Sequence, residues 1–161
     1  MDTEPRITGA SDRVRQIIKE EKERGELVET PFATFHFSYL SDPRFQQSAV
    51  RDQILQLNLS EITITNARRA IEDLRIKSHF TRLPLEITTR IPKEEEKHLI
   101  IPSLGIGGRG VSGFAMELYF DPDHPNVVQS LRERGAGIAH ELNHFARWQS
   151  GKMGGTLLNS V

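Results

Sequence analysis

The chain has 161 residues, a net charge of −1 at neutral pH and no cysteine. Its length fits one domain that can bury a hydrophobic core without disulfides. The absence of cysteine excludes disulfides, cysteine-ligated zinc and a cysteine nucleophile. The balanced charge gives no electrostatic reason to expect a nucleic-acid or membrane-surface partner. Because the polar start lacks the features of a signal peptide and no run of about 18 apolar residues occurs, we expect a cytoplasmic protein.

The first half of the chain mixes helical and extended patterns. We expect residues 1–9 to form a flexible tail, followed by a helix from Ser11 to about Arg24 that Gly25 ends. Alternating aromatic and polar residues predict a strand or extended segment over residues 32–40. Helical spacing of apolar residues predicts helices over residues 44–57 and 61–78, and a strand over 83–91 follows between two prolines.

The second half reads as strands followed by one long helix. Residues 93–97 are expected to be a solvated connection, and residues 98–102 a further short strand. The glycine-rich stretch 105–113 has neither the lysine of a P-loop nor a following helix, so we interpret it as a loop whose glycines let the backbone turn tightly or approach a ligand closely. Residues 114–120 form the strongest strand pattern, and Asn126 is expected to cap a helix over about 127–150. This order predicts an α+β fold with a small mixed or antiparallel sheet packed on helices.

The long helix contains the motif H-E-x-x-H, formed by His140, Glu141 and His144. Residues four apart share one face of a helix, so two imidazoles at this spacing can bind one Zn²⁺ ion. Glu141 is then free to hold the water at the zinc and take its proton. The spacing therefore predicts metal-assisted hydrolysis, most often of a peptide bond, with Zn²⁺ as the cofactor.

This C-terminal part resembles the zincin metallopeptidases, and within them a bacterial family of predicted zinc-dependent proteases. The resemblance spans about residues 100–161: the glycines from 105, the strand 114–120, the motif helix and the run 156–158. It implies a zincin-like fold in which the active-site helix follows an edge strand, and a substrate that pairs with this strand. By this likeness His140 and His144 bind the metal, Glu141 is the general base, and Phe114, Ala115 and Met116 bind a peptide or protein substrate.

The chain departs from the zincin pattern at the third metal ligand. Catalytic zinc takes three protein ligands, yet residues 145–161 contain no Asp, Glu, His or Cys, and the metzincin spacing fails because Arg147 and Ser150 stand where it needs Gly and His. Four explanations remain open: a chain cut short of its C-terminal part, which we favour; an upstream ligand such as Asp121, Asp123 or His124; a ligand from a second subunit; or weak metal binding without catalysis.

The sequence thus predicts one catalytic domain over residues 10–161, a zinc metallopeptidase with low or no activity in this chain alone. The alternative is a catalytically inactive pseudo-peptidase that binds extended peptides, and a more remote one is a zinc hydrolase that acts on another bond.

Overall fold

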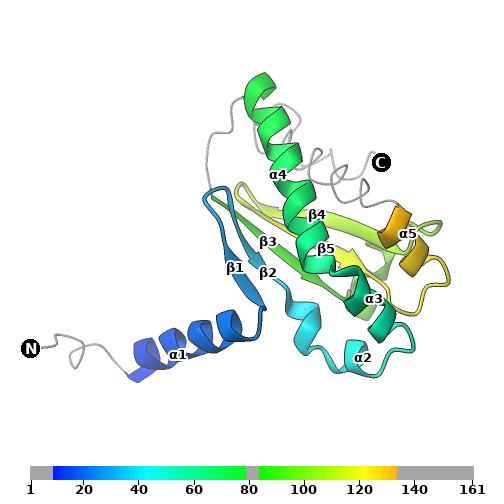
Figure 1. The fold of residues 1–161 in the computed structure, drawn as a ribbon, viewed down its shortest axis with the longest axis horizontal. Coiled ribbons are helices and arrows are strands. Elements are labelled where there is room, and N and C mark those ends of the chain that lie inside the picture. Colours follow the sequence, from blue (N-terminus) through cyan, green and yellow to red (C-terminus); the bar gives the residue numbers. More distant parts are fainter. Residues whose placement is uncertain (1–8, 79–83, 134–161) are drawn as a thin grey trace, which may run out of the picture.

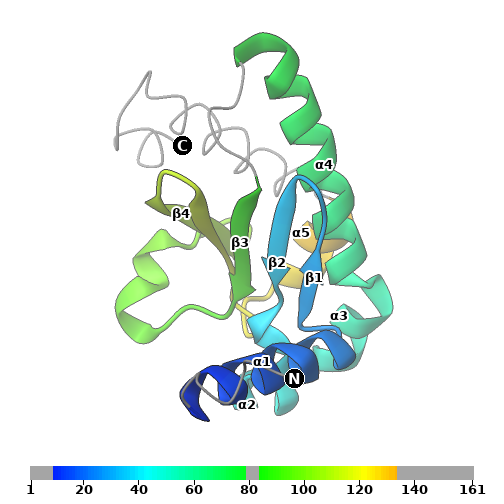
Figure 2. The same ribbon diagram turned by 90° about the vertical axis from the view of Figure 1, so that its left-hand side faces the viewer.

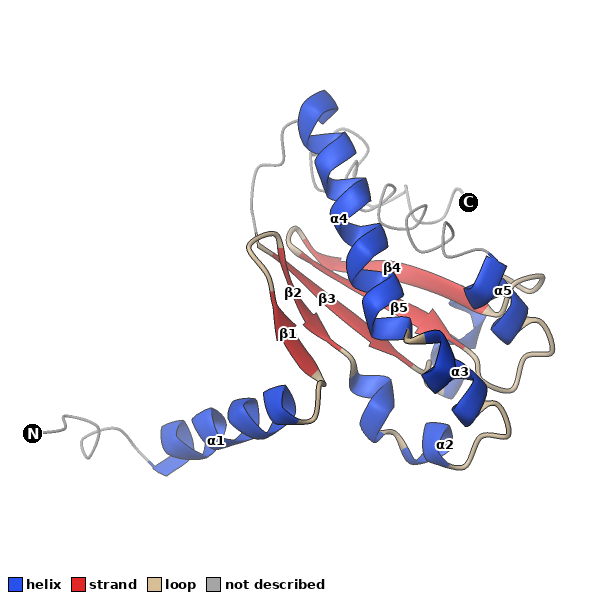
Figure 3. Cartoon of the chain, in the orientation of Figure 1, coloured by secondary structure: helices blue, strands red, loops and turns tan. Residues whose placement is uncertain are grey.

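The structure, a computed structural model, describes residues 9–78 and 84–133. Within these ranges five strands form one sheet: β1 (Leu27–Glu29), β2 (Ala33–His36), β3 (Leu85–Arg90), β4 (Ile106–Ser112) and β5 (Ala115–Phe120). The α-helices are α1 (Gly9–Glu23), α2 (Pro43–Gln46), α3 (Arg51–Leu57), α4 (Leu59–Ser78) and α5 (Val127–Glu133), and two short 3₁₀ segments are η2 (Ser38–Ser41) and η3 (Glu94–Leu99). Figure 3 shows α4 crossing the red strands and α1 extending away from them.

The sheet has the strand order β1-β2-β3-β5-β4. Strands β2, β3 and β5 are parallel, whereas β1 and β4 run antiparallel at the two edges. Parallel neighbours need a crossover connection, and α4 lies in the connection between β2 and β3. The expected mixed sheet packed on helices is therefore confirmed. The expectation that residues 114–120 form an edge strand is wrong, because β5 lies between β3 and β4.

One face of the sheet carries the hydrophobic core. Alternate residues of the central strands are buried, including Phe35, Ile87 and Met116, as the period of two in a strand requires. Helices α3, α4 and α5 cover this face with further buried apolar side chains: Ile54, Ala67, Ala70, Ile71, Val127 and Leu131. Figures 1 and 2 show α4 running across the sheet, with α5 on the same side.

Several elements differ from the sequence prediction in their extent. The predicted strand 32–40 ends at His36 and continues as η2, and the predicted helix 44–57 is two helices, α2 and α3. The Asp42 side chain caps α2 by accepting a hydrogen bond from the Arg44 amide at 2.8 Å. Before α3, the Ser48 hydroxyl accepts a hydrogen bond from the Val50 amide. Such local side-chain bonds compete with a continuous helix.

The glycine-rich stretch is a strand and not the predicted loop. Residues 106–112 form β4. Two glycines near its start, Gly105 and Gly107, occupy positions where a side chain would not fit. Gly105 has a φ of +77°, which a residue with a side chain rarely adopts. A Cβ atom at Gly107 would lie 2.0 Å from the Leu99 carbonyl oxygen, because the chain at Leu99 and Ile100 crosses directly beside β4. A strand is predicted from apolar and polar side chains that alternate along the chain, and the glycines of β4 have no side chains, so the sequence of β4 shows no such alternation.

Replacing Gly107 with alanine should destabilise the fold, since backbone atoms would have to move away from the new methyl group. We expect a loss of about 1–3 kcal/mol in the free energy of unfolding, measured by urea denaturation. Gly113 is the matched control, because a Cβ atom there meets nothing within 4 Å. Its alanine variant should stay within about 0.5 kcal/mol of the parent. Equal stability of the two variants would contradict this interpretation of β4.

Candidate functional site

The motif residues His140, Glu141 and His144 lie outside the described residues. The last described element before them is α5, which begins the predicted long helix at Val127 and is described as far as Glu133. Both the metal ligands and the general base therefore stay predictions. The described residues nevertheless show what leads into this helix and which strand edge lies open.

Two of the three predicted substrate-binding residues, Ala115 and Met116, belong to the internal strand β5, and Phe114 directly precedes it. Ala115 pairs with Glu86 of β3 on one side and with Ser112 of β4 on the other. Met116 is 1% exposed and pairs with β3 and β4 in the same way. The Phe114 carbonyl oxygen accepts a hydrogen bond from the Glu86 amide at 2.7 Å. Because the backbone on both sides of β5 is already paired, a substrate strand cannot add to it.

Strand β4 is the sheet edge next to β5. At its start, the Ile101 amide donates to the Ile106 carbonyl oxygen at 2.8 Å, and Ile100 forms a single bridge with Gly107. Beyond Gly107, no strand among the described residues pairs with the outer edge of β4. An edge of this kind presents unpaired backbone groups that an extended peptide can use. Sequence reasoning missed this strand because of its glycines.

An aromatic cluster fixes the point where β5 ends. Tyr39 lies 5.1 Å from both Phe45 and Phe120 between ring centroids, in edge-to-face geometry. All three rings are buried, and such pairs contribute about 0.5–1.5 kcal/mol beyond their burial. Because Phe120 is the last residue of β5, the cluster holds the start of the turn that leads to α5.

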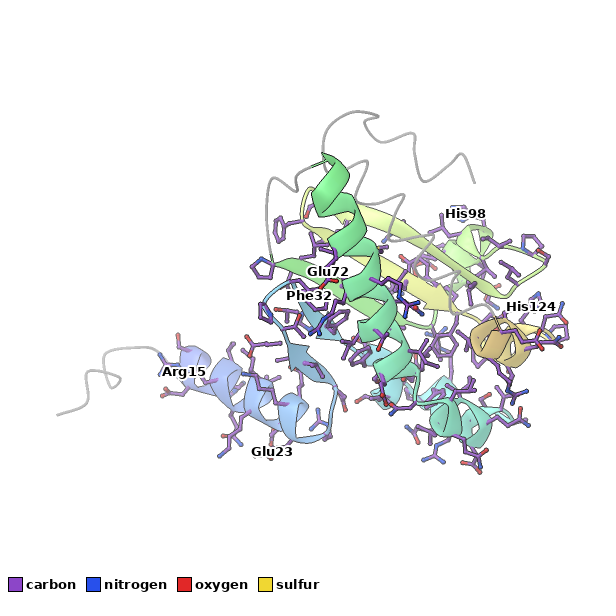
Figure 4. All side chains as sticks on the ribbon, turned by 45° about the horizontal axis from the view of Figure 1, so that its top comes forward. Arg15, Glu23, Phe32, Glu72, His98 and His124 are labelled. Carbon is purple, nitrogen blue, oxygen red and sulfur yellow. The ribbon has the colours of Figure 1, made fainter. Side chains whose placement is uncertain are left out.

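The turn between β5 and α5 contains Asp121, Asp123 and His124, which the sequence left open as metal ligands. The Asp121 side chain accepts a hydrogen bond from the Asp123 amide at 2.9 Å. The His124 ring accepts one from the Asn126 amide at Nδ1, 3.0 Å away, so its Nε2 donates to the Pro102 carbonyl oxygen at 2.6 Å. These bonds stabilise the turn (His124 is labelled in Figure 4). Across residues 9–78 and 84–133, no three His, Asp or Glu side chains gather in a group that could hold a metal ion.

The opposite face of the sheet carries a network of ion pairs. Arg90 binds Glu96 of η3 through two nitrogens, at 2.8 and 2.6 Å, and Glu117 of β5 at 2.9 Å. Arg109 of β4 also lies within 3.3 Å of both carboxylates, and the Tyr119 hydroxyl donates to Glu117. A pocket of about 490 Å³ opens beside this network. The sequence prediction treated residues 93–97 as solvated, but Glu96 is 6% exposed.

The charges of this network stabilise one another. Hydrogen bonds from Arg90 lower the pKa of Glu96 to about 2. Burial raises the pKa of Glu117, but hydrogen bonds from Arg90 and Tyr119 outweigh it, so this pKa also lies below its ordinary value. Burial and the neighbouring Glu117 raise the pKa of Tyr119. Carboxylates held ionised by arginines are poor proton acceptors, so we assign this network a structural role: it connects η3 to β3, β5 and β4.

The low pKa of Glu96 makes stability depend on pH. A carboxylate with a lower pKa in the folded state than its ordinary 4.5 stabilises the fold above pH 4.5, and this contribution is lost as the pH falls toward 2. We therefore expect Glu96→Gln to be less stable than the parent at neutral pH, with the difference shrinking between pH 4.5 and 2. Denaturant titrations across this range measure it.

The exposed Glu95 on the same 3₁₀ segment provides the control. Its Gln variant should follow the parent over the whole pH range. A gap between the Glu96→Gln variant and the parent that stays constant down to pH 2 would show that the Arg90 pair contributes nothing through ionisation.

Comparison of the chain with protein-family models, curated proteins and solved structures found no match. None of the described helices is both long and apolar enough to cross a membrane. The functional conclusion therefore depends on the motif in the sequence and on the sheet edge beside the strand that precedes it.

Proposed function

We propose that this chain is a zinc-dependent metallopeptidase of the zincin type. The observation that supports it most directly is the H-E-x-x-H spacing of His140, Glu141 and His144. The order of elements before the motif is compatible with this proposal, because β5 leads through a short turn into the start of the predicted helix, although β5 is paired on both sides where the resemblance implies an edge strand. Imidazole nitrogens are donors that zinc favours.

The proposed reaction is hydrolysis of a peptide bond. Zinc, when bound, polarises the scissile carbonyl and lowers the pKa of the attacking water to about 7. By their spacing, His140 and His144 would hold the ion together. Glu141 takes a proton from the water and later gives it to the leaving amine, so that one carboxylate acts as base and then as acid. Residues 145–161 offer no third protein ligand, so we expect weak metal binding and low activity in this chain alone.

The structure changes where a substrate is expected to bind. A peptide cannot add as a strand beside Ala115 and Met116, because both edges of β5 are occupied. We propose the outer edge of β4 instead, beyond Gly107, where an extended peptide would extend the sheet by one strand. The same edge suits the second candidate function, a non-catalytic domain that binds peptides. Equal peptide affinity with and without a chelator would favour this second candidate.

The proposed mechanism predicts separate effects for the motif residues. Glu141→Gln should keep zinc but lose peptidase activity, because the amide cannot accept a proton. His140→Ala and His144→Ala should each lower zinc affinity at least about 10–100-fold, since loss of even an indirect metal contact has effects of that size. Zinc content by plasma emission spectrometry, and cleavage of an unstructured protein substrate, measure the two properties.

His98 provides a matched histidine control. It is exposed on η3 (Figure 4) and lies far from the motif in sequence. The His98→Ala variant should keep both zinc and any activity of the parent. Peptidase activity that survives in Glu141→Gln would refute the mechanism, and zinc binding that His98→Ala weakens as much as His140→Ala would refute the ligand assignment.

A further inference from the structure

Helix α1 projects from the sheet and carries an apolar face that the other described residues leave uncovered. Figures 1 and 3 show it extending away from the sheet, and it packs mainly beside β1. Val14, Ile17 and Ile18 are 54%, 47% and 39% exposed, and their spacing places them on one face of the helix. A 15-residue helix is marginally stable in water by itself, and most helices gain stability by packing an apolar face.

Charged side chains lie on both sides of this apolar stripe, and the two sides differ in their charges. Arg13 and Glu20 are seven residues apart and lie on one side of the apolar stripe, whereas Arg15 and Lys22 lie on the other. The second pair has carboxylates within its own chain: Arg15 lies 3.9 Å from Asp12, and Lys22 forms an ion pair with Glu29. Arg13 and Glu20 are both exposed. One side of the stripe thus carries opposite charges one heptad apart.

We propose that α1 pairs with α1 of a second copy of this chain in an antiparallel, two-fold symmetric dimer. In an antiparallel helix pair, each side of a stripe faces the same side of the partner helix. Arg13 of one copy then lies opposite Glu20 of the other, and two-fold symmetry repeats this pair. A parallel pair would instead bring Arg13 opposite Arg15 of the other copy, and Glu20 opposite Lys22, which already has a carboxylate partner in Glu29. Val14, Ile17 and Ile18 of the two copies meet in the middle, and Glu21, seven residues after Val14 on the same face, lies at each end of the contact.

The composition of α1 favours binding to a second copy of the chain over binding to a membrane. Residues 12–23 contain four acidic and four basic side chains, so the helix has no net positive charge to attract anionic lipid. One helix pair buries less surface than the roughly 1,200–2,000 Å² of a stable interface. We therefore expect a weak dimer whose population rises with protein concentration.

Sedimentation equilibrium of the full chain, from about 10 µM to about 1 mM, tests the dimer. The parent should change from monomer to dimer over this range, and Ile17→Glu should remain monomeric with an unchanged circular dichroism spectrum. A parent that stays monomeric, or an Ile17→Glu variant that dimerises like the parent, overturns the proposal.

Charge variants test the antiparallel register. Glu20→Arg should weaken the dimer about tenfold, because Arg13 then faces arginine in both symmetric pairs. Adding Arg13→Glu to Glu20→Arg should restore it, since the opposite charges are only exchanged. Glu23→Arg changes the net charge equally and should leave the dimer unchanged, because the helical spacing places Glu23 on the side away from Val14, Ile17 and Ile18. Equal weakening by Glu20→Arg and Glu23→Arg, or no recovery in the double variant, refutes the antiparallel pairing.

Discussion

The pairing of β5 on both of its edges is the constraint on which the rest of the structure depends. Its parallel partner β3 follows the long crossover helix α4, and its antiparallel partner β4 comes from the hairpin just before it. Held on both sides, β5 buries Met116, Leu118 and Phe120 against the helices on one face. On the other face it presents Glu117 to Arg90 and Arg109. The same strand therefore connects the apolar core, the ion-pair network and the turn that leads to α5.

Much of the fold could be predicted from local patterns. The helix over residues 61–78 and the strands over 83–91 and 114–120 carry strong periodicity, and they are α4, β3 and β5 in the structure. The edge strand β4 could not be found in this way, because its glycines have no side chains to alternate. Its existence depends on backbone pairing with β5 and on the crossing at Gly107, which are contacts distant in sequence. The short strand β1 and the break between α2 and α3 were missed because short elements give little periodic signal.

In the candidate site, too, some features could be predicted from local sequence patterns and others could not. The H-E-x-x-H spacing is a local pattern, so sequence alone predicts two metal ligands and a base, and these stay predictions. The substrate strand is a question of sheet order, which local patterns do not contain: both edges of β5 are paired, so a peptide cannot add to it as a strand, and substrate binding by residues 114–116 stays a prediction. Glu96 shows the same limit: the acidic run 94–96 suggests a solvated face, yet one of its members is buried against Arg90. Burial of a single charge depends on a partner that lies elsewhere in the chain.

The most direct test of the central claim is X-ray absorption spectroscopy at the zinc edge on the zinc-loaded protein. Two histidines on one helical turn should give nitrogen scatterers at about 2.0–2.1 Å, together with the outer-shell pattern of imidazole rings. This pattern should correspond to two rings in the parent and to one ring in His144→Ala at saturating zinc. A spectrum with oxygen ligands only, or one that is identical in the parent and the variant, would contradict zinc binding by His140 and His144.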